Sequence, residues 1–323
     1  MGEVSTTLEA NTFDDLLHLV FDRLIAAGQR INPSRGPALE ETAVLLRLTD
    51  PRSRLSRSAG RSTVVSALGE LCWYLHGSDD VAHVAYYVPQ YRREAIDGRL
   101  PGAYGPRLFG PGGNGQLGRV IEILKQKPDS RQAVVQLFDA DDLSRTKDVP
   151  CTCTLQFLLR DGRVELIVHM RSNDAFLGLP HDLFAFTMFQ ELVARSIGAE
   201  LGAYTHFVGS LHLYDDRRAE VDAYLSEGWF AQGTAVMPPM PDGDPWAAVG
   251  VMLEAEQRIR LAPAEEYEAE GLAEGYWGDL AKVLAAFRLR RRPERLPAIA
   301  ASLASPFYGI YVTDRIHKGG AAS

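Results

Sequence analysis

Two cysteines, Cys151 and Cys153, are the first residues in the sequence whose type and spacing could do chemistry. They stand at the expected start of a strand, where residues two apart point to the same face. A Cys-x-Cys pair can bind a metal ion, but no second cluster of cysteine or histidine completes a set of four ligands, so we predict no metal. Two alternatives remain open: a pair of small buried apolar side chains, or a nucleophilic thiolate at Cys151, which needs positive charge nearby.

The segment RSNDAFLGLPHD places an arginine at the end of an expected strand. Arg171, followed by the hydroxyl of Ser172, is a pattern that can bind phosphate through paired hydrogen bonds. The alternative is a surface arginine beside a loop. Asn173, Asp174 and Asp182 gather in an otherwise apolar neighbourhood, and buried polar groups need partners or a function. Their density favours a binding site.

Three further residues are candidates because of their surroundings. His212 and Tyr214 alternate with leucines in GSLHLYDD, so they share one strand face and can contact a sugar hydroxyl; a hydrogen-bonded core pair is an equal alternative. Glu70 lies inside the almost wholly apolar helix expected at 63–75. An unpaired carboxyl there has a large desolvation cost, which raises its pKa, and a raised carboxyl pKa is typical of general acids and bases. The alternative is that Glu70 lies on a narrow solvated stripe of the helix.

These residues require elements that bring them together. Apolar periodicity, turn residues and caps predict helices at 12–27, 63–75, 116–127 and 183–198, and strands at 43–48, 132–138, 153–160, 164–171 and 203–208. Asp161-Gly162 predicts a hairpin between two of these strands. The Gly/Pro-rich segment 101–115 predicts no regular element. We therefore expect one α/β domain over 1–323, with a helical C-terminal elaboration over about 217–323, in which RLRRRPER is a solvated helix end with no assigned role.

Composition narrows the class of protein. The 323 residues are 46% hydrophobic and 24% charged, which excludes disordered and fibrous chains. The net charge of −8 argues against nucleic-acid binding, so an anionic partner must be bound by a local arginine cluster. No apolar run is long enough for a membrane helix, no secretory signal is visible, and three cysteines suggest a reducing compartment. We expect a cytoplasmic protein with no nucleic-acid or membrane partner.

Read together, VPCTCTLQF, RSNDAFLGLPHD and GSLHLY resemble, in order and spacing, the motifs of the thymidylate synthase family, and the similarity runs from about residue 31 to 216. The resemblance implies an α/β (α+β) sandwich of a mixed sheet with helices, which dimerises through the sheet. It also implies a pyrimidine nucleoside monophosphate as substrate, 5,10-methylenetetrahydrofolate as co-substrate and no metal.

The same resemblance implies a role for each matching residue. Cys151 is the nucleophile that attacks C6 of the pyrimidine, Glu70 is the catalytic glutamate and Tyr104 is the tyrosine of the YG turn. The expected substrate-binding residues are those for phosphate (Arg35, Arg171, Ser172, and Arg131 crossing into the site of the other subunit), those for the sugar 3′-hydroxyl (His212, Tyr214) and Gly178 near the base, and we add Asp174 from the polar group described above.

The departures from the family pattern point to a different substrate. Asp182 stands where members that act on dUMP have asparagine. A protonated aspartic acid can donate to N3 of cytosine and accept from its 4-amino group, whereas uracil presents the reverse pattern. A buried carboxyl near other acids can hold that proton. Asp182 therefore predicts a cytidine monophosphate.

Other departures concern the product. Thr152 replaces a usual histidine, YYVPQYRREAIDGRL has no tryptophan, and HKGGAAS is unlike the family's apolar closing tail. A site that admits water would form a hydroxymethyl group, so the chain resembles the cytidylate (CMP/dCMP) 5-hydroxymethylase branch. Gln132 replaces a usual second arginine, so this region of the site differs from that of the synthases. Separately, analogy with bacterial nucleoside-modifying pathways such as antibiotic biosynthesis favours CMP slightly over dCMP. The alternatives are a thymidylate synthase or dCMP methylase that uses hydride transfer, and a nucleotide-binding protein without turnover. A cysteine hydrolase is a further alternative, but this sequence shows no Cys-His pair with the spacing of a hydrolase.

Overall fold

The computed structural model describes residues 6–58, 63–110, 115–229, 236–263, 267, 269 and 271–313. Two segments discussed above lie outside the described residues. They are the C-terminal HKGGAAS, which we compared with the family's closing tail, and residues 111–114 of the Gly/Pro-rich segment.

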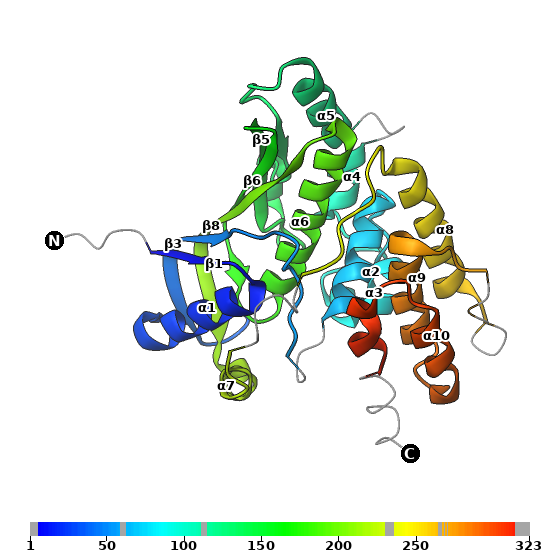
Figure 1. Ribbon diagram of the computed structural model, residues 1–323. Helices are drawn as coiled ribbons and strands as arrows, with labels where there is room; N and C mark the ends of the chain where they lie inside the picture. The colour runs from blue at the N-terminus through cyan, green and yellow to red at the C-terminus, as the bar shows by residue number, and fades with distance from the viewer. Residues whose placement is uncertain are drawn as a thin grey trace.

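A mixed sheet forms one layer of the protein (Figure 1). Its strands follow the order β1-β3-β8-β6-β5-β4, with β2 paired to β3 and β7 paired to β8. Parallel pairing joins β8 to β6 and β7, and antiparallel pairing joins β8 to β3. The strand bounds are β1 Thr7–Ala10, β2 Gln29–Ile31, β3 Ala38–Leu48, β4 Val134–Gln136, β5 Thr152–Arg160, β6 Arg163–Met170, β7 Asn173–Asp174 and β8 Glu200–Tyr214.

Helices cover the sheet in successive layers. Helix α6 packs on β6 and β8, α2 packs on α6, and the C-terminal helices lie beyond α2 (Figure 1). Helix α1 packs on β1 and β3. The helix bounds are α1 Phe13–Ala27, α2 Val64–Leu75, α3 Val81–Tyr87, α4 Tyr104–Phe109, α5 Gln116–Gln126, α6 Gly178–Ile197, α7 Arg218–Ser226, α8 Trp246–Leu261, α9 Gly275–Arg288 and α10 Leu296–Ser302.

Local sequence explains several of these elements. Helix α1 begins after Thr12, whose Oγ1 accepts a hydrogen bond from the backbone N–H of Asp15 at 3.1 Å. The hairpin between β5 and β6 turns at Asp161-Gly162, where φ is 50° and 72°, the left-handed pair that a two-residue hairpin needs. The expected helix and hairpin are both confirmed.

The expectation for 101–115 was wrong, because α4 occupies Tyr104–Phe109 within it. Pro106 lies in the first turn, where its missing N–H removes no helical hydrogen bond. Gly110 then ends the helix with φ of 60°. The turn residues therefore mark the boundaries of a short helix rather than its absence.

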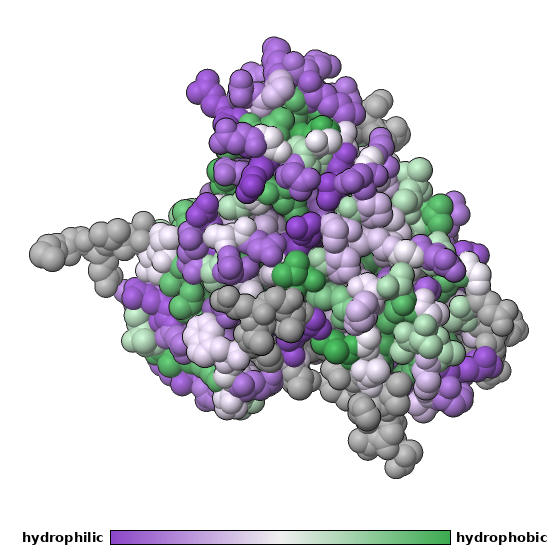
Figure 2. Space-filling view, viewed as in Figure 1, coloured by the Kyte–Doolittle hydropathy of each residue, from purple (hydrophilic) through white to green (hydrophobic). Residues whose placement is uncertain are grey.

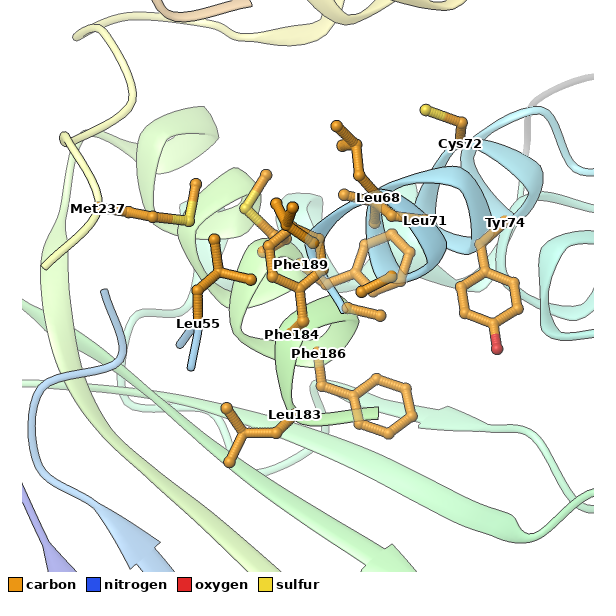
Figure 3. Packing of buried hydrophobic residues seen from close by; sticks show 14 of the residues in the cluster. Leu55, Leu68, Leu71, Cys72, Tyr74, Leu183, Phe184, Phe186, Phe189 and Met237 are labelled. Atoms are coloured by element: carbon orange, nitrogen blue, oxygen red, sulfur yellow. The ribbon is translucent and has the colours of Figure 1, made fainter. Parts of the chain in front are cut away.

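The core between α2 and α6 is aromatic and aliphatic (Figure 3). Phe184, Phe186 and Phe189 of α6 are fully buried, as are Leu68 and Leu71 of α2. On the surface, hydrophilic and hydrophobic residues are interspersed over the face seen in Figure 2. The mixed sheet with its helical layers confirms the expected fold class. Of the helices that the structure describes, none has the length and apolar character required to span a bilayer.

Candidate active site

Cys151 lies directly before β5, beside a guanidinium group. Nη2 of Arg171 is 3.7 Å from its Sγ, and the backbone N–H of Arg171 donates to the Cys151 carbonyl at 2.9 Å. The arginine side chain also donates to the carbonyls of Val149 and Pro150, at 3.0 and 2.9 Å, which holds it in place. Burial raises the pKa of the Cys151 thiol, and the charges of Arg171 and Arg35 oppose that rise. The structure thus places the expected nucleophile against the expected phosphate ligand.

The other phosphate candidates are more loosely placed. Arg35 lies on the exposed loop between β2 and β3, donates to Glu94 at 2.8 Å and is close enough for its charge to act on Cys151. Ser172 directly follows Arg171 and is half-buried. Arg131 is exposed, and within the described residues its one hydrogen bond is through its carbonyl, to Gln156. Arg131 therefore does not join the cluster within a single chain.

Glu70 is buried in α2 and is held by two tyrosine hydroxyls. Tyr74 donates to its Oε1 at 2.8 Å, and Tyr91 donates to the same oxygen. Burial raises the pKa of both tyrosines well above the ordinary value, so their hydroxyls stay protonated. The alternative of a solvated stripe does not hold, because the side chain is buried and its Oε1 accepts two hydrogen bonds. Sequence reasoning missed both tyrosines: Tyr74 follows Glu70 by one helical turn and could have been found from that spacing, whereas Tyr91 comes from a separate segment.

Tyr104 begins α4 and connects it to the cysteine loop. Its hydroxyl oxygen accepts from the backbone N–H and Oγ1 of Thr152, at 3.1 and 2.9 Å, and its ring stacks on Tyr74 with centroids 5.2 Å apart. Burial raises its pKa well above the ordinary value, as does the charge of Asp182. Because its oxygen accepts twice, the proton of Tyr104 remains available for donation.

Asp182 lies in the first turns of α6. Burial raises its pKa well above the ordinary value, and the charges of Glu70 and Asp174 raise it further. Nδ2 of Asn173 donates to its Oδ2 at 2.8 Å. A Cβ at Gly178 would come within 2.9 Å of that Nδ2, so glycine leaves the space in which the two side chains meet.

A chain of hydrogen bonds continues behind Asn173. Its Oδ1 is 3.1 Å from Nε2 of His206, and Nδ1 of His206 is 2.6 Å from the hydroxyl of Tyr204. Burial lowers the pKa of His206 to about 3, so the ring is neutral and has one donor and one acceptor. The consistent directions are Tyr204 to His206, His206 to Asn173 and Asn173 to Asp182. We call Tyr204, His206 and Asn173 the relay; the same-face alternation of Tyr204 and His206 in β8 was a signal that sequence reasoning did not use.

His212 and Tyr214 end β8 on the same side. His212 is buried, its Nδ1 lies 3.4 Å from the Ser210 carbonyl, and its ring meets that of Tyr214 edge to face at 5.0 Å. Asp174 is the register partner of His212 in the parallel pair of β7 and β8. The two strands thus bring both sugar-site candidates and Asp174 next to the segment that carries Arg171.

One more titratable group lies beside the cysteine loop. Asp148 accepts from the backbone N–H of Gly102 at 2.6 Å, and burial raises its pKa to about 6. Sequence reasoning did not single it out, since an aspartate in a loop usually reads as solvated.

Comparison with known proteins agrees with this arrangement. The sequence matches the family model for thymidylate synthase over residues 58–237. This chain therefore belongs to the thymidylate synthase family. It is 33% identical over 111 residues to the thymidylate synthase of Listeria monocytogenes serotype 4a (strain HCC23), an alignment that covers 34% of this chain and 35% of that relative.

Proposed function

We propose that the protein transfers a one-carbon unit from 5,10-methylenetetrahydrofolate to C5 of a cytidine monophosphate, with water capture giving 5-hydroxymethylcytidylate. The observation that carries the choice of base is Asp182, a carboxyl whose pKa burial raises well above the ordinary value. A raised pKa favours the protonated form, and a protonated carboxyl has one donor and one acceptor to offer.

The relay supports a defined position for that proton. Because Asn173 donates to Oδ2 of Asp182, Oδ2 acts as an acceptor and the proton is favoured on Oδ1. A hydroxyl beside a carbonyl oxygen matches N3 and the 4-amino group of cytosine. Uracil would bring its N3–H to a donor and its O4 to an acceptor, leaving buried groups unpaired.

The remaining candidates divide the work of binding and bond formation. Arg171, Ser172 and Arg35 bind the phosphate, and His212 and Tyr214 bind the sugar 3′-hydroxyl. The Cys151 thiolate adds to C6, which makes C5 nucleophilic toward the methylene carbon. This addition needs the thiol to lose its proton, and the guanidinium of Arg171 favours the thiolate.

Glu70 is the group we assign to proton transfer, together with ordered water and Tyr104. Its Oε1 is occupied by the hydroxyls of Tyr74 and Tyr91, which leaves Oε2 as the oxygen directed to exchange a proton. Loss of the C5 proton and cleavage of the bond between the methylene carbon and the folate nitrogen release tetrahydrofolate, which is not oxidised, and leave an exocyclic methylene on C5. Water then adds to that methylene carbon to form the C–OH bond and gives up a proton, and the C6–S bond to Cys151 breaks.

The test is to supply the protein with 5,10-methylenetetrahydrofolate and CMP, dCMP or dUMP in parallel. Mass spectrometry should find the nucleotide heavier by CH2O for CMP, less for dCMP, and little product from dUMP, and the absorbance of dihydrofolate should not rise. Dihydrofolate formed with a product heavier by CH2 would instead show hydride transfer, as in a synthase or dCMP methylase. Binding of nucleotide with no product from any substrate would show a non-catalytic relative.

We further propose that the protein acts as a homodimer in which Arg131 crosses to the other site. Arg131 is exposed near the sheet edge and has no side-chain partner among the described residues, which leaves it available to a second copy. Mixing two inactive variants, Arg131→Ala and Cys151→Ala, tests this. Subunit exchange should restore about a quarter of the wild-type activity, because one kind of site in the mixed dimer then has both residues; no recovery in dimers shown to have exchanged would contradict it.

A further inference from the structure

A second group of ionisable side chains lies away from the candidate active site, where α2, α3 and α8 meet. His76 directly follows α2, His83 belongs to α3 and Glu256 belongs to α8. The Glu256 side chain is fully buried and that of His83 is 6% exposed, while His76 keeps 25% exposure. One ligand atom of each residue lies within 4.8 Å of the other two.

The two histidine–carboxylate distances in this group match the spacing of metal ligands, although they reach different oxygens and the three ligand atoms together lie within 4.8 Å of one another. Nε2 of His76 is 3.4 Å from Oε2 of Glu256, and Nε2 of His83 is 3.4 Å from Oε1. Hydrogen bonds between nitrogen and oxygen are about 2.7–3.2 Å long. Four ligands at about 2.0–2.2 Å around a tetrahedral zinc ion lie roughly 3.3–3.5 Å from one another.

His83 supplies a second, independent observation. Its Nε2 is buried and lies 3.4 Å from Oε1 of Glu256, yet among the described residues it makes no hydrogen bond of good geometry. Buried polar atoms without a partner are rare in native proteins, and each calls for a ligand, water or ion. Here the vacant nitrogen faces two other metal-binding groups.

Neighbouring residues hold the carboxylate in place. Tyr87 and Arg260 donate to Oε1 of Glu256, each at 2.8 Å, whereas Nη2 of Arg260 donates to Oε2 over a longer distance of 3.4 Å. The positive charge of Arg260 opposes a cation nearby, but it is directed chiefly to Oε1. Oε2 therefore keeps a lone pair for a metal, and the groups on Oε1 act as the outer partners that orient metal-binding carboxylates.

We propose that His76, His83 and Glu256 bind a Zn²⁺-type divalent ion, with a fourth position open to water or to Cys72. Cys72 lies one helical turn before His76 and points away from the Phe186 side of α2 (Figure 3), and its Sγ is 3.7 Å from Sδ of Met252 in α8. The ion would join the C-terminal helix α8 to α2 and α3. We predicted no metal from the sequence because only the Cys-x-Cys pair was considered, and Glu256 lies far along the chain from the two histidines.

The experiment uses the full-length protein freed of metal with a chelator and then titrated with Co²⁺ and with Zn²⁺. We expect one Co²⁺ per chain with the intense visible absorption of a tetrahedral site, displacement of Co²⁺ by Zn²⁺, and a higher melting temperature with Zn²⁺. These readouts do not depend on the activity proposed above.

Variants locate the site. His76→Gln and His83→Gln should each weaken Zn²⁺ binding by about 100-fold or more and abolish the rise in melting temperature. The matched control His169→Gln, at an exposed position in β6, should bind as the wild type does. His76 is partly exposed, so its variant should fold, as circular dichroism will show. Absence of stoichiometric binding by the wild type, or equal binding by wild type and a folded His76→Gln, would overturn the proposal.

Discussion

Replacing Asp182 by asparagine exchanges a carboxyl for an amide of the same size, and our proposal is that this carboxyl is protonated in the wild type. In the wild-type protein, a uridylate would bring two ring groups against like partners, and each unpaired buried group costs about 1–3 kcal/mol. Two such groups amount to about 2–6 kcal/mol, or roughly 30-fold to 10⁴-fold in relative kcat/KM, taking tenfold per ~1.4 kcal/mol. The Asp182→Asn variant should lose most of this preference for cytidylates and shift toward uridylates by at least about tenfold.

The relay permits this shift rather than preventing it. To present its oxygen and nitrogen in the order that uracil needs, the new amide must turn, and Asn173 must then accept from it instead of donating. The neutral ring of His206 can change tautomer, and the Tyr204 hydroxyl can accept as well as donate. All the hydrogen bonds can therefore reverse together.

The assay is direct competition between the two nucleotides. Equimolar CMP and UMP are supplied with 5,10-methylenetetrahydrofolate, and the product ratio from mass spectrometry gives the ratio of kcat/KM values. Asp161→Asn makes the same chemical change in the β5–β6 turn and should leave the ratio unchanged. If Asp182→Asn is inactive, calorimetry supplies the ratio of Kd values. A folded variant with the wild-type ratio in both measurements would refute base reading by Asp182.

Three further changes test other parts of the site. Cys151→Ser should abolish product formation but keep nucleotide binding within about threefold, because the thiol forms a bond that binding does not need; calorimetry and product analysis separate the two. Tyr91→Phe removes one of the hydroxyls on Glu70 and should lower kcat by roughly 10-fold or more with little change in nucleotide Kd, as steady-state kinetics will show. Asp148, whose pKa is raised to about 6, favours the folded state while protonated, so its contribution falls as pH rises from about 4 through 6. Asp148→Asn should flatten that part of the stability–pH curve measured by urea unfolding, and an unchanged curve would contradict the assignment.

Local patterns predicted those elements whose formation depends mainly on local interactions. The cap at Thr12 and the Asp161-Gly162 turn lie where the sequence placed them. β3 and β8 extend well beyond 43–48 and 203–208, because antiparallel pairing between them continues through polar residues such as Glu40 that show no strand pattern. Pairing between distant segments, rather than propensity, sets the length of both strands.

The residues of the candidate site also divide into those that local motifs predict and those that only the tertiary fold brings together. Cys151 and Arg171 were each predicted from a motif, and the backbone hydrogen bond between them is the physical reason that they lie together. The hydroxyl of Tyr91 and the ring of His206 reach the site from segments whose position depends on the tertiary fold. Residues that hold a catalytic side chain need only the right distance in space, so spacing along the chain does not reveal them.

The proton on Asp182 and the proton on Cys151 are coupled through charge. An ionised Asp182 raises the pKa of the Cys151 thiol and therefore opposes formation of the nucleophile. Burial and the neighbouring charges of Glu70 and Asp174 raise the pKa of Asp182, and its protonated form lacks that repulsion. The protonated state that we propose recognises cytosine is consequently also the state in which the thiol ionises more easily. The neutral amide of Asp182→Asn should preserve this second effect, so its Cys151 should react with iodoacetamide at least as fast as in the wild type while its base preference changes. A much slower reaction in a folded variant would mean that Asp182 acts on the thiol in some other way.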